Sequence, residues 1–317
     1  MTNEQSFTKI ESDVLNLPPA VGKEFNSGHE KLKTILNEDE IVQWAAAGYA
    51  IAQQSFRSWE AAAEFYRVSP NLLQDQLPIS YMESWSNFGR ELAAASASLA
   101  IAYFRTTPEI LKIISPDDIP RWAGQGQRLY QGTWKSSALS SHFFENSASF
   151  LALMPLDTLE DFVSFLEVLS QKSHDLAEEC LNNSPQVFSE IARDDIAPLI
   201  SLLQKAAGTN WKYAKESLES GAVALQRIDP QFRIRFLEYA EEMILLGGKH
   251  FLPLLNDGSR ALAAIPTALH GEILFKFDEL SQVSKPAAVD FLIKTPNVLS
   301  LANIDGLGQW YQQGLET

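Results

Sequence analysis

The stretch WSNFGRELAAASASLAIAYFRTTPEIL, residues 85–111, decides the fold of this chain. It begins with a tryptophan four residues before a glycine and continues through an alanine-rich apolar segment. It ends with an aromatic pair, a Thr-Pro step and a leucine. This order of residue types returns along the chain at a nearly constant interval. Such self-similarity is typical of solenoids built from stacked helical units.

Each return is marked by a large apolar anchor, and neighbouring anchors are 41, 37, 40, 37, 37, 37 and 37 residues apart. The anchors are Trp44, Trp85, Trp122, Phe162, Leu199, Phe236, Ile273 and Trp310. No segment has the period-two alternation of a half-buried β-strand. The sequence therefore predicts an all-α protein, an α-solenoid of the HEAT or armadillo kind with about seven repeats of 37–41 residues.

Each repeat is predicted to hold three helices, the first of which passes through the anchor with one apolar stripe facing inward. The second helix carries a column of aromatic or leucine residues, namely Tyr66, Phe104, Phe144, Leu181, Leu218, Leu255 and Leu292. The third is expected to start at a Ser/Thr-Pro step, with the hydroxyl as N-cap and the proline in the first turn. The prolines of these steps are Pro70, Pro108, Pro185 and Pro296.

Four anchors are followed one helical turn later by a glycine, at Gly48, Gly89, Gly126 and Gly314. Glycine inside a helix costs about 1 kcal/mol of helix propensity relative to alanine. We therefore expect these glycines to make room for an aromatic ring or a neighbouring helix, so that tight packing compensates.

Two regions are predicted along the chain. Residues 1–28 fall outside the repeat and form an N-terminal tail and cap, of which the polar part up to Asp13 is expected to be mobile. Residues 29–317 form the repeat domain, which ends within an incomplete eighth repeat that Trp310 and Gly314 begin. An uncapped solenoid end exposes its stacking surface. We therefore expect a further C-terminal domain or self-association over this end.

The charge of the chain disfavours two classes of partner. It carries 25 Lys and Arg against 40 Asp and Glu, a formal net charge of −15, whereas nucleic acids and anionic membranes attract basic surfaces. The longest apolar stretch, residues 92–104, is shorter than the roughly 20 residues of a membrane-spanning helix. A single cysteine, Cys180, and an N-terminus without a signal-peptide pattern favour a cytoplasmic protein.

No residue pattern points to catalysis, a cofactor or a metal. The histidines fall at unrelated positions of the repeat, and no two have the i, i+4 spacing of a helical metal site; they are His29, His142, His174, His250 and His270. Cys180 belongs to a largely apolar column, which favours packing over nucleophilic chemistry. We therefore predict a non-enzymatic protein without a cofactor.

One column of the repeat departs from the apolar rule. Eleven residues before the proline position stand Trp59, Ala97, Ser137, His174, Trp211, Gly248 and Lys285. Core columns are apolar in nearly every repeat, so a column that mixes tryptophan with lysine and histidine is expected to face solvent. The candidate partner surface is therefore Trp59, His174, Trp211 and Lys285, with the tryptophans as interface anchors. The alternative is that both tryptophans pack locally over the helix turn.

The repeat also resembles a known family. Residues 85–111, with their Trp-x-x-x-Gly, aromatic-pair and Ser/Thr-Pro-x-x-Leu elements, are similar to the helical region before the von Willebrand factor A domain in NorD-type and CoxE-like proteins. The likeness covers residues 30–315. It implies work beside a MoxR-type AAA+ ATPase in the maturation of metalloenzymes. The metal-binding domain of that family is missing from this sequence, so no ligand residue is carried over.

Two functions from different classes follow. The favoured one is a non-enzymatic scaffold for protein–protein interaction, whose partner is an AAA+ ATPase or its client enzyme. The alternative is a helical-repeat enzyme or small-ligand binder with a pocket in the groove of the solenoid. The lack of a clustered nucleophile or base in the sequence favours the scaffold.

Overall fold

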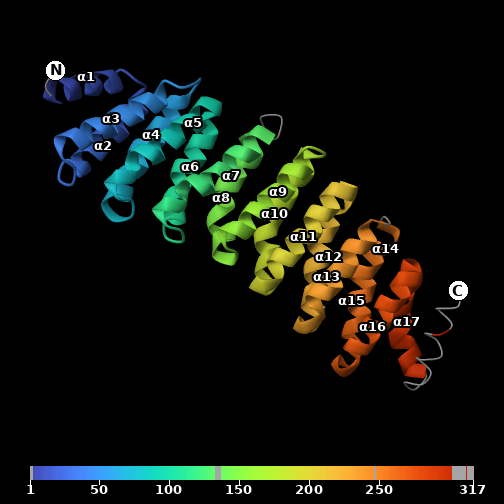
Figure 1. Cartoon of the computed structure of the whole chain (residues 1–317). Coiled ribbons are helices and arrows are strands. Elements are labelled where there is room, and N and C mark those ends of the chain that lie inside the picture. The colour runs from blue at the N-terminus through green and yellow to red at the C-terminus, as the bar shows by residue number, and fades with distance from the viewer. Residues whose placement is uncertain (1–2, 133–136, 246–247, 302–311, 313–317) are drawn as a thin grey trace. The chain divides into compact units, whose positions relative to one another are not determined.

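The structure is a computed structural model that describes residues 3–132, 137–245, 248–301 and 312 (Figure 1). Every secondary-structure element in these ranges is helical, which confirms the all-α prediction. Within the same ranges, no helix combines the length and the apolar character that crossing a membrane requires. The chain divides into two compact units, residues 1–156 and residues 157–317.

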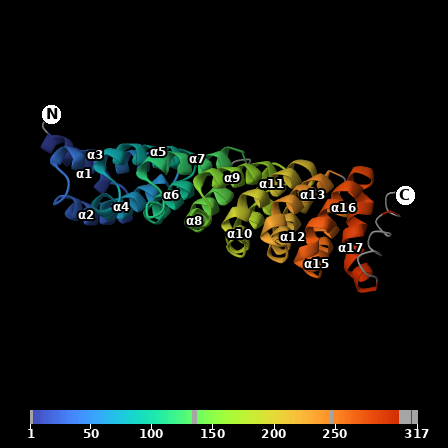
Figure 2. The ribbon, with the colours of Figure 1, turned by 60° about the horizontal axis from the view of Figure 1, so that its bottom comes forward.

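The first unit is built from helices that pair in sequence order. They are α1 (Asn3–Leu15), α2 (Pro19–Leu32), α3 (Glu38–Ala52), α4 (Ser58–Asp75), α5 (Met82–Ala95), α6 (Ala97–Ile110), α7 (Ile119–Gly132) and α8 (Ser137–Leu153). The odd-numbered helices α1, α3, α5 and α7 pack each on the next, and so do α2, α4, α6 and α8. Figure 2 shows these two rows, and the core of the unit lies between them.

The second unit has the same alternation. Its helices are α9 (Leu156–Ser170), α10 (His174–Ser189), α11 (Arg193–Asn210), α12 (Ala214–Arg227), α13 (Arg233–Ile244), α14 (Gly248–Pro253), α15 (Ser259–Ala263), α16 (His270–Val283) and α17 (Lys285–Leu301). A π-helical turn, Leu254–Gly258, joins α14 to α15. Helix α10 packs on α12, α11 on α13, and α15 on α17.

The N-terminal residues are more ordered than the sequence predicted. A mobile tail was expected up to Asp13, but Asn3–Leu15 forms α1, which packs against α3. Helix α2 runs to Leu32, so the predicted start of the repeat domain at residue 29 falls inside it. The buried residues Val14, Val21 and Phe25 supply the apolar stripe that holds this helix pair on the rest of the unit.

The prediction of three helices per repeat is wrong, because the Ser/Thr-Pro steps lie inside continuous helices. Pro70, Pro108, Pro185 and Pro296 are internal to α4, α6, α10 and α17. The hydroxyl before the proline does not cap a new helix. In α6, Thr107 Oγ1 instead donates to the carbonyl oxygen of Tyr103, 2.7 Å away and one turn back. A mid-helix proline removes one backbone donor, and here packing outweighs that cost.

The glycines after the anchors do make room for rings, as the sequence predicted. A Cβ at Gly89 would lie 2.0 Å from Cζ of Phe104, and a Cβ at Gly126 would lie 2.2 Å from Cζ of Phe144. Gly48 faces the ring of Tyr66 in the same way. In these three helix pairs, the first helix therefore approaches the second closely at a glycine, where any larger residue would collide with the ring.

Aromatic rings link successive helix pairs of the first unit. Phe65 lies 5.4 Å from Trp85 between ring centroids, and Tyr103 stacks on Trp122 at 5.5 Å. Phe25 stacks on Trp44 at 5.4 Å, so α2 contributes to this series like a later helix. Aromatic pairs at such separations contribute about 0.5–1.5 kcal/mol beyond their buried area. The same contact, between an aromatic ring of one helix pair and the anchor tryptophan of the next, thus recurs with the repeat period of the sequence.

The end of the predicted repeat domain lies outside the described residues. This concerns Trp310 and Gly314, on which the prediction of an incomplete eighth repeat depends.

Candidate interaction site

The four residues of the predicted partner surface share a place in the fold. Trp59 lies in the first turn of α4 in the first unit. In the second unit, His174 and Lys285 begin α10 and α17, and Trp211 begins the 3-10 turn before α12. All four residues are half-buried, so neither tryptophan is as deeply buried as Trp85. That these residues bind a partner remains a prediction, because the structure shows only that they lie at similar positions at the starts of helices or turns.

The turn that leads into Trp59 exposes an aromatic ring. Phe56 lies between α3 and α4 and is 90% exposed, the most exposed of the large apolar side chains described. A phenyl ring in water costs roughly 1.5–3 kcal/mol relative to a buried one. Aromatic residues, phenylalanine among them, are enriched in the cores of protein interfaces.

Hydrogen bonds and a left-handed residue fix the backbone around Phe56. The next residue, Arg57, has φ of 64°, which costs a non-glycine residue about 1–2 kcal/mol. The buried hydroxyl of Ser58 donates to the carbonyl of Ser55 at 2.8 Å. The hydroxyl of Ser55 in turn donates to the carbonyl of Ala93 in α5 at 2.6 Å. The turn that carries Phe56 is therefore tied to the next helix pair.

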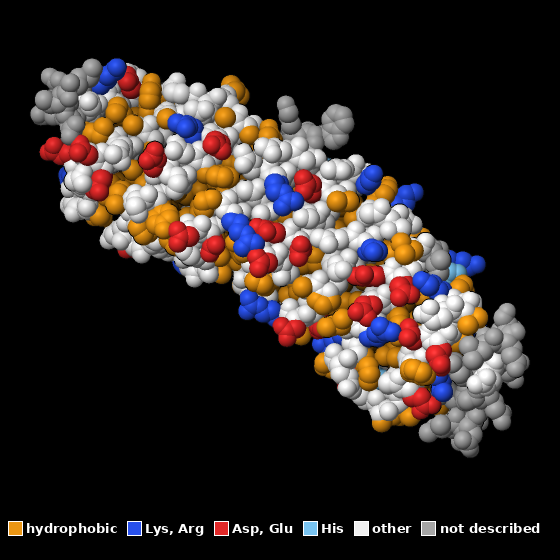
Figure 3. Space-filling model, in the orientation of Figure 1, with side chains coloured by type: hydrophobic (Ala, Val, Ile, Leu, Met, Phe, Trp, Pro, Cys, Tyr) orange, Lys and Arg blue, Asp and Glu red, His pale blue; other side chains and the backbone are white. Residues whose placement is uncertain are grey.

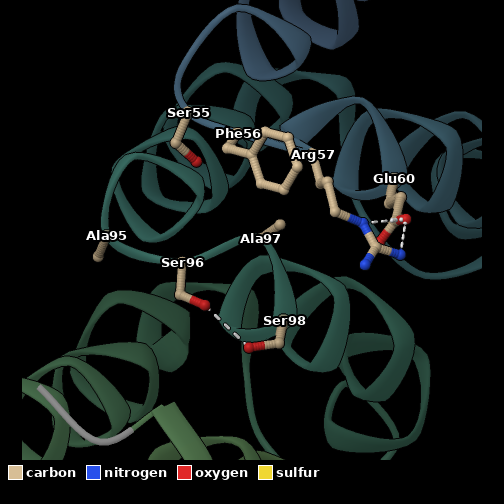
Figure 4. A pocket seen from close by; sticks show the side chains of 8 residues that line it. All are labelled: Ser55, Phe56, Arg57, Glu60, Ala95, Ser96, Ala97 and Ser98. Carbon is tan, nitrogen blue, oxygen red and sulfur yellow. Dashed lines mark hydrogen bonds and ion pairs between the residues drawn. The ribbon is translucent and has the colours of Figure 1, made fainter.

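A hollow of about 420 Å³ opens beside this ring. Its lining comes from the α3–α4 turn on one side and from the α5–α6 connection on the other, as Figure 4 shows. The lining residues are Ser55, Phe56, Arg57, Glu60, Ala95, Ser96, Ala97 and Ser98. Among them is Ala97, a member of the column that the sequence predicted to face solvent. The hollow therefore lies beside the starts of α4 and α6, the second helices of two successive pairs.

The hollow carries one charge of each sign. Arg57 donates from Nε and from Nη2 to Oε1 of Glu60, the first of these bonds measuring 2.7 Å. Arg57 Nη1 and Glu60 Oε2 lie outside this pair of bonds. The rest of the lining is apolar or hydroxylic, and the hydroxyls of Ser96 and Ser98 lie 2.9 Å apart. The surface thus offers a ring, hydroxyls and a locally neutral ion pair.

A second hollow, of about 280 Å³, lies on α4 and α6 in the same unit. Arg67 and Arg105 line it, and both bind the carboxylate of Glu64, with Arg105 Nε 3.2 Å from Oε1. Burial alone would raise the pKa of Glu64, but the hydrogen bonds and charges of Arg67 and Arg105 outweigh burial, so its pKa is lowered. The three side chains tie α4 to α6, which is a structural role.

Two groups that could carry chemistry are held in inert states. Burial, followed by the charges of Glu179 and Glu219, raises the pKa of Cys180 to about 12, so its thiol is protonated at neutral pH. This agrees with the predicted packing role. Nε2 of the buried His270 lies 2.8 Å from the carbonyl of Leu262 and ties that helix end to α16. Over the described ranges, no three His, Cys, Asp or Glu side chains gather closely enough to hold a metal ion.

The charged side chains of the visible face are mixed in sign. In Figure 3, Lys and Arg side chains lie among Asp and Glu side chains, and the described part of that face has no large basic patch. The ion pair of Arg235 with Asp278, at 3.1 Å, is an example in the second unit. On this face, acidic side chains are therefore interspersed with basic ones.

Phe56 belongs to none of the repeat columns, so the sequence pattern did not predict it. Pro70 follows its anchor Trp44 by 26 residues, whereas Pro108 follows Trp85 by only 23. The extra residues form the turn that carries Phe56. The first repeat is longer than most, at 41 residues, and this extra length was the sequence feature that could have indicated the turn.

Comparison of the chain with protein families, with curated proteins and with solved structures found no match.

Proposed function

We propose that this protein is a non-enzymatic scaffold for protein–protein interaction, and that the edge around Phe56 is part of its binding surface. The observation that carries the proposal is the 90% exposure of Phe56 on a turn whose backbone is fixed by hydrogen bonds. A rigid aromatic loses little conformational entropy on binding. Interfaces are enriched in such residues because they bury a large apolar area.

The scaffold is an α-solenoid of the HEAT-like kind in this proposal. Its support is the packing of every helix pair of the first unit on the next pair, in step with repeats of 37–41 residues. Two helices per repeat match the HEAT pattern better than the three of armadillo repeats. A stack of this kind repeats its helix connections. Trp59 lies in the first turn of α4 in the first unit, and in the second unit His174, Trp211 and Lys285 each begin a helix or turn.

The partner is a protein, and the resemblance to NorD-type and CoxE-like proteins extends the proposal to a MoxR-type AAA+ ATPase or its client enzyme in the cytoplasm. The sequence elements behind this extension are those of residues 85–111. The structure gives these elements a packing role, since Trp85, Gly89 and Phe104 meet in the core. The fold therefore accounts for them without a partner, and the choice of partner rests on the resemblance alone.

Affinity purification from the native organism tests this proposal. The full chain serves as bait beside the variants Phe56→Ala, Trp211→Ala and Phe275→Ala. Phe275 is a matched control, because it is an exposed phenylalanine (62%) on α16, far from the Phe56 turn in sequence. We expect a protein whose recovery falls at least fivefold with Phe56→Ala and is unchanged with Phe275→Ala. Equal recovery of every co-purified protein by all four baits would contradict the proposal.

The same material tests the alternative of a small-ligand binder or enzyme. Native mass spectrometry of the chain purified from its own organism detects a retained small molecule as an added mass. A stoichiometric adduct that Phe56→Ala removes would favour the small-ligand function for this site over the scaffold. We expect the unmodified mass of the chain.

A further inference from the structure

We infer that the hollow beside Phe56 takes the Phe56 ring of a second copy of this chain, so that two copies associate about a two-fold axis through this patch. The inference rests on the proposed function, because it requires the Phe56 edge to be a protein interface. It adds that one protein bound at this edge is a second copy of the chain.

The patch is self-complementary in shape. A two-fold interface needs one surface to carry both a projection and a matching depression, since each copy contacts the other through the same residues. Phe56 is the projection, and the hollow of about 420 Å³ at its side is the depression. A cavity of about 150 Å³ is enough to hold benzene. Figure 4 shows the Phe56 ring among the residues that line this hollow.

The patch is also self-complementary in charge. Its lining holds a single cation, Arg57, and a single anion, Glu60. Their mutual hydrogen bonds use Arg57 Nε and Nη2 and Glu60 Oε1. A two-fold axis places Arg57 of one copy against Glu60 of the other, where Nη1 and Oε2 form the intermolecular pair. The formal charge of −15 on each chain repels at long range. At moderate salt this repulsion is screened beyond about 10 Å, whereas contacts within the patch are kept.

The surroundings of the patch suit a second copy. The hydroxyls of Ser96 and Ser98 belong to the lining of the hollow and give it hydrogen-bond capacity. Two phenylalanines that enter neighbouring hollows lie close to the axis, and aromatic pairs favour such close offset contact. Each ring buries on the order of 150–250 Å², which is small beside the roughly 1,200 Å² of a stable interface. The association is therefore expected to be weak.

The same residue types recur two repeats further along the sequence. Ser55-Phe56-Arg57-Ser58 corresponds to Thr133-Trp134-Lys135-Ser136, which stands between α7 and α8. Residues 133–136 lie outside the described residues, and the proposed site does not include them. The recurrence indicates that the aromatic and basic pair belongs to the longer form of the repeat rather than to chance.

Sedimentation equilibrium of the full chain at about 0.02–1 mM and 0.3 M NaCl tests the inference. We expect a monomer–dimer equilibrium for the wild type. Phe56→Ala raises the dissociation constant at least tenfold, and the control Phe275→Ala changes it less than twofold. Both side chains are largely exposed, so both variants fold, as thermal melting will verify. A wild type that stays monomeric at 1 mM overturns the inference, and so does a dimer that Phe56→Ala leaves unchanged.

A charge exchange separates the intermolecular pair from the intramolecular one. Arg57→Glu and Glu60→Arg each place two like charges in the patch, and each variant alone is expected to lose at least tenfold in self-association. When the two are mixed in equal amounts, every chain still lacks its internal pair, but opposite charges face each other across the axis. We expect a mixed dimer within about threefold of the wild-type affinity. A mixture that stays monomeric overturns the inference.

The two proposals fail separately in these experiments. If the chain stays monomeric but Phe56→Ala loses a different partner protein, the proposed function is supported and the self-association is contradicted. If the chain dimerises through Phe56 but every bait co-purifies the same proteins, the self-association is supported and the scaffold for a different protein is contradicted.

Discussion

The indole Nε1–H of Trp44 donates a hydrogen bond of 2.7 Å to the hydroxyl of Ser69, 25 residues further along the chain. Trp85 donates to Thr107 in the same way at 3.2 Å. The acceptors are the residues before Pro70 and Pro108, which the sequence suggested as helix N-caps. Their position is thus explained by a tie between the two helices of a pair.

Removing the acceptor of this tie should be costly. Ser69→Ala leaves a fully buried indole N–H without a partner, which costs about 1–3 kcal/mol of unfolding free energy. Ser147→Ala is the matched control in the third repeat. Its hydroxyl donates to the carbonyl of Phe143, and Trp122 Nε1 has no acceptor among the described residues. We expect Ser147→Ala to cost less than Ser69→Ala in urea denaturation. Equal losses would mean that the indole bond contributes nothing.

Two glycines of α7 allow a direct test of the ring contact. Gly126→Ala brings a Cβ to 2.2 Å from the Phe144 ring, and overpacking of this kind costs about 1–3 kcal/mol. Gly124→Ala meets nothing within 4 Å, and it should stabilise the protein by about 0.5–1 kcal/mol through helix propensity. In denaturant melts we expect the unfolding free energy to fall for Gly126→Ala and to rise for Gly124→Ala. If both variants stabilise, the Phe144 ring has room to move away.

The core columns should tolerate truncation far less than the exposed turn. Trp122→Ala and Phe104→Ala each remove a fully buried ring and should lower the unfolding free energy by about 3–5 kcal/mol. Phe56→Ala removes an exposed ring and should change it by less than about 0.5 kcal/mol. Chemical denaturation with fluorescence detection measures all three. A cost below about 1 kcal/mol for Trp122→Ala would place this residue at the surface and contradict the packing.

The sequence could predict the core because burial repeats with the period of the helix pair. Trp44, Trp85 and Trp122 recur with this period, and all three side chains are buried. The helix boundaries were harder to predict, since a Ser-Pro or Thr-Pro step is a frequent helix start and local sequence does not reveal packing strong enough to carry a proline inside α4 or α6.

The candidate site could be predicted only in part. The column that contains Trp59 and Ala97 was predicted to face solvent, and Ala97 does line the hollow beside the start of the second helix. Phe56 belongs to no column, because its turn is an insertion that only the longer repeats contain. Exposure of such a residue is a property of the three-dimensional turn, which Arg57 and Ser58 fix through backbone geometry and a buried hydroxyl.

Cys180 should make the stability of the protein fall at alkaline pH. Burial raises the pKa of its thiol in the folded state to about 12, whereas the thiol of the unfolded chain ionises near pH 9.0. Between these values the unfolded state binds fewer protons than the folded state, so unfolding becomes easier as pH rises. One such group contributes a slope of at most about 1.4 kcal/mol per pH unit in this window. Below pH 9 its contribution is fully present.

Comparison of the wild type with Cys180→Ala isolates this effect. Other buried groups, such as Tyr66 and Tyr103, whose pKa values burial also raises, are common to both proteins and cancel. The variant loses part of the core, so we expect it to be less stable at pH 7 by about 0.5–1.5 kcal/mol. This difference should shrink as the pH rises from 9 to 10.5, because only the wild type loses the thiol contribution. A thiol reagent should label Cys180 rapidly at pH 8 in urea and slowly in the native protein. A difference in stability that is constant with pH, together with rapid native labelling, would show that the thiol is exposed and ionises normally.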